Sequence, residues 1–212
     1  MSFEEQREQM VLEQLLARGL TDERLLAAFR KVPRHRFVPP ELEAQAYTDH
    51  PLPIGAGQTI SQPYMVALMT SRLVLQGHER VLEIGAGSGY QAAILAELAL
   101  EVFSVERIPE LLRAAAERLG ALGYLNVHFT AGNGSLGWAA HAPYDAIVVT
   151  AAAPEIPEPL LAQLADGGTM VLPIGPPEGQ MLVEARKRHG TVTQREIASC
   201  VFVPLLGRYG WT

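Results

Sequence analysis

The sequence lacks the features that define several common protein classes. Cys200 is the only cysteine among 212 residues, so the chain can form no internal disulfide. The only lysines are Lys31 and Lys187. Neither follows a glycine, which excludes a phosphate-binding loop of the Gly-Lys type. No apolar run approaches the ~20 residues of a membrane span, and the polar, acidic start of the chain is unlike a signal peptide. We therefore expect a soluble, cytoplasmic protein with no membrane partner.

Charge and catalytic motifs exclude further classes. The net charge is −6, the pI is about 5.5 and no basic run occurs, so there is no general electrostatic attraction toward nucleic acid. There is no G-x-S-x-G nucleophile elbow and no H-E-x-x-H motif, and the six histidines lack metal-ligand spacing. We expect no metal site and no nucleic-acid partner.

The pattern of apolar residues predicts an α/β protein. Helical spacing over residues 3–31 predicts an N-terminal helical addition, and residues 45–63, rich in Pro, Gly and small polar residues, are expected to be irregular. A helix over 63–75 follows. Strands are then predicted at 80–84, 101–106, 127–131, 146–150 and 169–173, and helices at 90–98, 109–122 and 157–164. This alternation predicts a Rossmann-like, mostly parallel sheet with helices on both faces.

The end of the chain changes pattern. Apolar runs at 181–185 and 197–204 have no convincing helix between them, which predicts an antiparallel hairpin at the edge of the sheet. The length suits one domain. We divide it into an N-terminal helical and loop region (1–62), a cofactor-binding α/β core (63–175) and a strand extension (176–212).

The most informative segment is 81–90, Val-Leu-Glu-Ile-Gly-Ala-Gly-Ser-Gly-Tyr. It predicts a buried strand that ends in a glycine turn and opens a helix, which is where open α/β sheets bind nucleotide-like ligands. Tyr90 stands where the dinucleotide fingerprint has Gly or Ala, so a ligand without a pyrophosphate, such as S-adenosylmethionine, fits better. Glu106 ends the next strand, about 20 residues on, where a carboxylate can bind both ribose hydroxyls.

Three other segments are candidates for function. Residues 55–65 form a loop that precedes the glycine turn, although Ser61 or Thr59 could instead cap the following helix. Asn133 follows the third strand and could bind an adenine edge, or could simply form an Asn-Gly turn. Residues 151–153 are three alanines, which can neither hold nor stack a base and so argue against nucleic-acid amino methylation.

Segments 55–65, 81–90 and 142–154 carry a resemblance to a known family. In them, and in shorter matches at 32–38, 171–175 and 202–205, the chain closely resembles protein-L-isoaspartate O-methyltransferases over nearly its whole length. The loop ending in Thr59-Ile60-Ser61 is the specific part, because many methyltransferases share the glycine turn.

The resemblance implies an S-adenosyl-L-methionine-dependent enzyme of protein repair. Such enzymes methylate the α-carboxylate of L-isoaspartyl residues in damaged proteins and peptides, and the ester then closes to a succinimide that can reopen to normal aspartate. A carboxylate with a pKa near ~4 is already ionised at neutral pH, so no general base is needed. Alignment of the reactants can then supply most of the catalysis.

The resemblance also implies roles for individual residues. Ser61 would be the catalytic residue, orienting the acceptor carboxylate rather than acting as a nucleophile. The predicted substrate-binding residues are Thr59, Ile60, Ser61, Val203 and Arg208, the last being either a partner for substrate or a surface charge. The predicted cofactor-binding residues are Glu83, Gly85, Gly87, Ser88, Gly89, Glu106, Asn133 and Gly134.

One position departs from the family. The family usually has Asp where this chain has Asn133, so we expect adenine binding weakened by ~1 kcal/mol. Two alternatives remain open, namely a different carboxylate acceptor in a specific peptide and a non-catalytic cofactor-binding protein. We expect the chain to act as a monomer.

Overall fold

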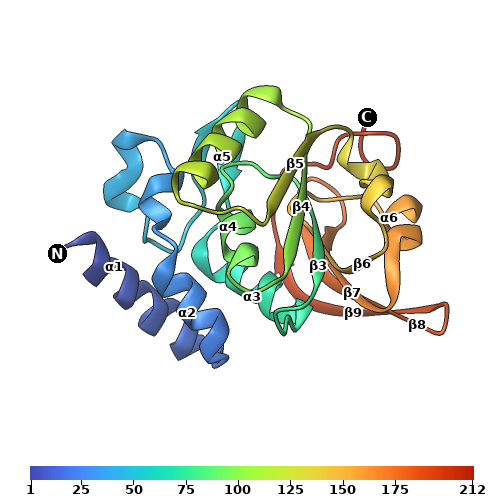
Figure 1. Ribbon diagram of the computed structural model, residues 1–212, viewed down its shortest axis with the longest axis horizontal. Coiled ribbons are helices and arrows are strands. Elements are labelled where there is room, and N and C mark those ends of the chain that lie inside the picture. Colours follow the sequence, from blue (N-terminus) through green and yellow to red (C-terminus); the bar gives the residue numbers. More distant parts are fainter.

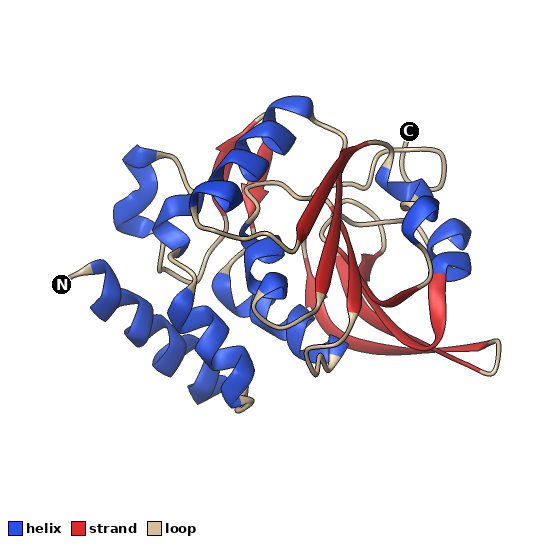
Figure 2. Cartoon of the chain, viewed as in Figure 1, coloured by secondary structure: helices blue, strands red, loops and turns tan.

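The computed structural model describes every residue, Met1–Thr212, and is organised around one large sheet (Figures 1 and 2). The sheet has seven strands in the order β5-β4-β3-β6-β7-β8-β9. Their bounds are β3 Arg80–Ile84, β4 Glu101–Glu106, β5 Val127–Ala131, β6 Tyr144–Val149, β7 Leu164–Ile174, β8 Gln180–Arg188 and β9 Thr191–Cys200. Strands β3 to β7 pair in parallel, whereas β8 and β9 are antiparallel. The predicted Rossmann-like sheet with an antiparallel C-terminal edge is confirmed.

Apolar residues on both faces of the central strands explain why these segments lie in the middle of the sheet. In β6, Ala146 and Val148 join a buried cluster of 34 residues, while Ile147 and Val149 join a second cluster of 16. The larger cluster packs the N-terminal helices, α3 and α4 against one face of the sheet, and the smaller one lies on the other face beneath α6. A parallel strand buried on both sides needs this near-continuous apolar sequence.

Helices cover both faces of the sheet, as Figure 1 shows. Their bounds are α1 Phe3–Met10, α2 Glu23–Lys31, α3 Pro63–Leu73, α4 Tyr90–Ala96, α5 Pro109–Ala121 and α6 Glu158–Gln163. Gly19, with φ of +86°, ends the irregular turns that continue α1, and the Asp22 carboxylate caps α2. None of these helices combines the length and the apolar character that crossing a membrane would need.

Two expectations about local structure were wrong. Residues 45–63 were expected to be irregular, but β1 (Leu52–Gly55) and β2 (Gln58–Ile60) pair as a small antiparallel hairpin. The strands have four and three residues, too few for alternation to reveal them. At the other end, β9 covers Thr191–Cys200 rather than 197–204. The residues of β9 are polar and largely exposed, so the apolar pattern does not mark where the strand begins. Residues 201–204 lie beyond the end of β9.

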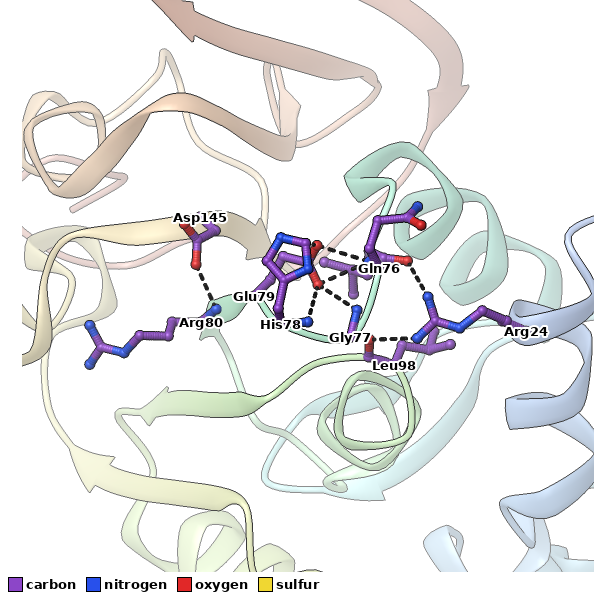
Figure 3. Close-up of polar contacts among 9 residues, drawn as sticks. Arg24, Gln76, Gly77, His78, Glu79, Arg80, Leu98 and Asp145 are labelled. Atoms are coloured by element: carbon purple, nitrogen blue, oxygen red, sulfur yellow. Dashed lines mark hydrogen bonds and ion pairs between the residues drawn. The ribbon is translucent and has the colours of Figure 1, made fainter.

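The connection between α3 and β3 is held by partly buried polar contacts (Figure 3). The Glu79 carboxylate accepts hydrogen bonds from the backbone N–H groups of residues 76–78 at 2.8 to 3.2 Å. Arg24 of α2 donates to the carbonyl oxygens of Leu75 and Leu98 at 2.9 and 3.4 Å. These contacts tie the α3–β3 connection to α2 and to Leu98, which follows α4.

Candidate active site

A cavity opens at the carboxyl ends of β3, β4 and β6. Strands β3, β4 and β5 progress toward one edge of the sheet, and β6 then returns to the other side of β3. Such a reversal of strand order leaves a crevice, which is the usual ligand site of open α/β sheets. The open cavity, including its mouth, encloses about 960 Å³.

The glycine turn forms the floor of the cavity. Gly85 has φ of +95°, a conformation that favours glycine. The Thr150 hydroxyl, at the end of β6, lies within hydrogen-bond distance of the carbonyl oxygens of Ile84 and Gly85, at 3.0 and 2.7 Å. A Cβ on Gly85 would overlap the Thr150 hydroxyl. Thr150 therefore holds the turn closed and makes glycine necessary at residue 85.

Glu106 joins the glycine turn to the start of α5. Its Oε2 accepts from the Gly87 N–H and its Oε1 from the Ile108 N–H, both at 2.9 Å. The carboxylate is 6% exposed and lines the cavity. Since each carboxylate oxygen has a second lone pair, both can accept another donor from a ligand. Two adjacent hydroxyls, such as those of a ribose, match this arrangement.

The loop ending in Ser61 lines the same cavity, along with Gln58, Thr59 and Ile60. Gln62 is the N-cap of α3, and no side chain caps the first turn at that position. The alternative that Ser61 or Thr59 caps the helix is therefore wrong. The Asp49 carboxylate instead accepts from the Tyr64 N–H at 3.2 Å. The Ser61 hydroxyl is not engaged in capping and is available to a ligand.

The C-terminal segment closes another side of the cavity. The Ala152 N–H donates to the Val203 carbonyl, and the Leu205 N–H donates to the Ala152 carbonyl, both at 2.8 Å. This pairing continues past the end of β6 and brings Val203, Leu205 and Leu206 to the cavity wall. Val203, predicted as a substrate contact, lines the same cavity as Ser61.

Two residues of the glycine motif lie outside the cavity lining. Gly89 has φ of +87°, and a Cβ there would lie 2.7 Å from a methyl group of Leu119. Glycine is therefore needed here so that the start of α4 can pack against α5, and not to make room for a ligand. Glu83 is fully buried between strands and accepts a hydrogen bond from the Ser104 hydroxyl. Burial raises the pKa of Glu83 to about 8, with the nearby Glu106 charge adding to the shift and the Ser104 hydrogen bond opposing it. The one hydrogen bond of the Glu83 carboxyl group is thus made within the protein, to Ser104.

Asn133 and Arg208 also lie outside the lining, whereas Gly134 belongs to it. The Asn133 Oδ1 accepts from the Ser135 N–H and hydroxyl at 3.1 and 2.8 Å, starting a short turn over Gly134–Leu136. The Asn-Gly turn, one of the two alternatives for this segment, is thus present. Arg208 is exposed and forms none of the ion pairs within the chain.

Several lining residues were not predicted from the sequence. They include Gln58, Met69, Gln91, Arg107, Thr150 and Leu206. Met69 has the spacing of an ordinary core residue of α3, so the sequence does not reveal that it also lines the cavity. Thr150 could have been found, because it follows the strand that lies beside the glycine turn in a parallel sheet.

Comparison with known proteins identifies the family. A sequence profile described as Protein-L-isoaspartate(D-aspartate) O-methyltransferase matches residues 5–210. A Protein-L-isoaspartate O-methyltransferase of Methanoculleus marisnigri is 57% identical over 97% of this chain and 94% of its own length. One of Dictyoglomus thermophilum is 54% identical over 99% of this chain and 94% of its own.

Solved structures agree with the sequence relatives. A protein-L-isoaspartate O-methyltransferase superimposes with a TM-score of 0.86 at 30% identity, covering 96% of this chain and 67% of its own. A putative enzyme of the same name from Plasmodium falciparum, in complex with S-adenosyl-L-homocysteine, gives 0.82 at 28% identity, covering 94% and 98%. The profile match and these relatives over nearly the full length show that the chain belongs to the protein-L-isoaspartate (D-aspartate) O-methyltransferase family.

Proposed function

We propose that this protein transfers a methyl group from S-adenosyl-L-methionine to the α-carboxylate of L-isoaspartyl residues in damaged proteins and peptides. The observation that carries the proposal is that Ser61, with its hydroxyl not used as a cap, lines the same cavity as Glu106 and the glycine turn. One cavity thus offers a site for a ribose-bearing cofactor and a hydroxyl that can orient an anion. The names of relatives more than 50% identical support the same activity.

The cavity suits S-adenosyl-L-methionine. Glu106 would bind the ribose hydroxyls, while Gly85, Gly87 and Ser88 would lie against the amino-acid portion. Gly134 would lie at the adenine end, and Asn133 would act there through its turn rather than by direct contact. When bound, the cofactor supplies a methyl group on a sulfonium, which is already activated for transfer. The S-adenosyl-L-homocysteine bound by the Plasmodium falciparum structure supports this choice of cofactor.

Ser61 acts as the group that aligns the acceptor. Its hydroxyl donates a hydrogen bond to one oxygen of the isoaspartyl carboxylate and leaves the other free to attack the methyl group. Because the carboxylate is ionised at neutral pH, no residue has to remove a proton. Backbone groups of Thr59 to Ser61 and of Val203 hold the peptide main chain on either side. Arg208, exposed near the C-terminal segment, can pair with an acidic group of a longer substrate.

We further propose that the protein works as a monomer in the cytoplasm, on protein and peptide substrates alone. The net charge of −6 and the absence of a basic run support the exclusion of nucleic acid.

Conversion of a damaged peptide tests the function. An L-isoaspartyl peptide is incubated with the protein and S-adenosyl-L-methionine, and chromatography separates it from the matching aspartyl peptide. The proposal predicts accumulation of the aspartyl form only when protein and cofactor are both present. Unchanged isoaspartyl peptide, together with measurable cofactor binding, would contradict it and favour a different acceptor or a non-catalytic role.

A further inference from the structure

Arg34 connects two separate segments next to the active-site loop. It lies in a short turn, Arg34–Phe37, and its side chain is 0% exposed. Its Nε donates to the carbonyl oxygen of Ala46 and its Nη2 to that of Ser61, both at 2.7 Å. Hydrogen bonds from a charged donor to a buried acceptor are among the stronger ones in proteins. The residue therefore ties the main chain of Ser61 to the N-terminal region.

The surroundings of Arg34 make its charge expensive for stability alone. No carboxylate forms an ion pair with it, and its guanidinium lies over the Tyr90 ring with Cζ 4.8 Å from the ring centroid. Burial lowers the pKa of Arg34 to about 10, so it is still charged at neutral pH. An apolar side chain of similar volume commonly stabilises such a position as well as a buried charge does. The two carbonyl contacts are what an apolar side chain could not supply.

Ser61 has no hydrogen-bond partner for its carbonyl oxygen other than Arg34. It lies between β2 and α3 and belongs to neither, so no strand or helix hydrogen bond holds its carbonyl. The main chain on either side is held by other bonds, because Ile60 pairs with Leu52 in the β1–β2 hairpin and the Gln62 carbonyl accepts from the Met65 and Val66 N–H groups. Arg34 is the side chain that directly restrains Ser61.

We propose that Arg34 is a positioning residue for methyl transfer, because its hold on the Ser61 carbonyl aligns the Ser61 hydroxyl with the acceptor carboxylate. Arg34 does not line the cavity, so it touches neither cofactor nor substrate. Its loss should therefore lower kcat while leaving cofactor affinity largely unchanged. The inference rests on the proposed function.

Substitution by methionine and lysine separates positioning from folding. Arg34→Met keeps the length but removes every donor, and we expect it to lower kcat for an isoaspartyl peptide about 10- to 100-fold. The Kd for S-adenosyl-L-methionine should stay within about 3-fold of the wild-type value. Arg34→Lys keeps one charged donor, which can reach one carbonyl, and should recover part of the lost kcat. All assays are run well below the Tm of the least stable variant. If Arg34→Met does not fold, the kcat of Arg34→Lys decides between positioning and folding.

Arg24 provides a matched control. It also lies in the N-terminal region and donates to two carbonyl oxygens of distant segments, those of Leu75 and Leu98. Figure 3 shows its bond to Leu98. It is not part of the cavity lining. Arg24→Met should lower the Tm with kcat unchanged. An Arg34→Met variant that loses no more kcat than Arg24→Met would overturn the inference.

A double variant tests the route through Ser61. If Arg34 acts by placing the Ser61 hydroxyl, Arg34→Met combined with Ser61→Ala should have nearly the kcat of Ser61→Ala alone. Two effects that multiply would show that Arg34 acts elsewhere and would overturn the inference. The activity of the wild type on an isoaspartyl peptide separates failure of the proposed function from failure of the role of Arg34. An active wild type with an unimpaired Arg34→Met contradicts only the role of Arg34, whereas a wild type that methylates no isoaspartyl peptide overturns the proposed function and this inference with it.

Discussion

Replacing Gly85 by alanine should damage the cofactor turn through two separable effects. The first is the backbone, because a non-glycine residue at φ of +95° costs about 1–2 kcal/mol. The second is the overlap of the new Cβ with the Thr150 hydroxyl. Overpacking of this kind costs about 1–3 kcal/mol. Together the two effects should lower the free energy of unfolding by about 2–5 kcal/mol.

Gly123 isolates the backbone effect. It has φ of +85°, close to that of Gly85, but a Cβ there would meet no atom within 4 Å. Gly123→Ala should therefore cost only the backbone term, about 1–2 kcal/mol. Urea unfolding at constant pH measures both variants, and calorimetric titration with S-adenosyl-L-methionine measures the loss of affinity, which we expect for Gly85→Ala alone.

Thr150→Ala supplies the second test. Removal of the hydroxyl costs about 1 kcal/mol by itself, because the Gly85 carbonyl loses its donor. In the double variant it also removes the overlap, so Gly85→Ala with Thr150→Ala should be no less stable than Gly85→Ala alone. Strict additivity, or a Gly85→Ala that costs no more than Gly123→Ala, would refute the assignment of the overlap.

Three further changes test two residues of the site and one residue of the α3–β3 connection. Ser61→Ala should lower kcat about 10- to 100-fold and leave the cofactor Kd within about 3-fold of the wild-type value. Initial rates measure kcat and titration calorimetry measures Kd. Equal loss of turnover and of cofactor affinity would contradict a positioning role. Glu106→Gln should weaken cofactor binding about 10- to 100-fold, because a charged acceptor becomes neutral. The kcat at saturating cofactor should change little. Unchanged affinity in the same titration would refute the role of Glu106 in cofactor binding. For Glu79, desolvation by burial raises the pKa, but backbone N–H donors, foremost those of Gln76 and Gly77, outweigh it and hold the pKa below 4.5. Glu79→Gln should therefore cost about 1–3 kcal/mol at pH 7, and the gap to wild type should shrink as the pH falls below about 4.5. A gap independent of pH in urea unfolding would contradict this.

The central sheet could be predicted because its strands are buried on both faces. Segments such as Val81–Ile84 have apolar residues at nearly every position, and a proline marks the start of α3 before them and of α5 between β4 and β5. The β1–β2 hairpin could not be predicted, because its pairing depends on positive φ angles at residues 55–57 rather than on alternation. Helix ends differed by one or two residues, as fraying at helix ends leads one to expect.

The candidate site was predictable where residues follow strands. Gly85, Gly87 and Glu106 line the cavity because the carboxyl ends of parallel strands meet at one edge. Glu83 and Gly89 share the motif but serve the protein interior, and no sequence pattern distinguishes these two roles. Arg34 could not be assigned, because its partners are backbone carbonyls that only the folded chain brings near it.

Transfer of a labelled methyl group tests the central claim most directly. Methyl-labelled S-adenosyl-L-methionine is incubated with the protein and with two peptides that differ only in having L-isoaspartate or normal aspartate at one position. We predict base-labile label, as expected of a methyl ester, on the isoaspartyl peptide alone. Label on both peptides, or on neither while the cofactor still binds, would contradict the account.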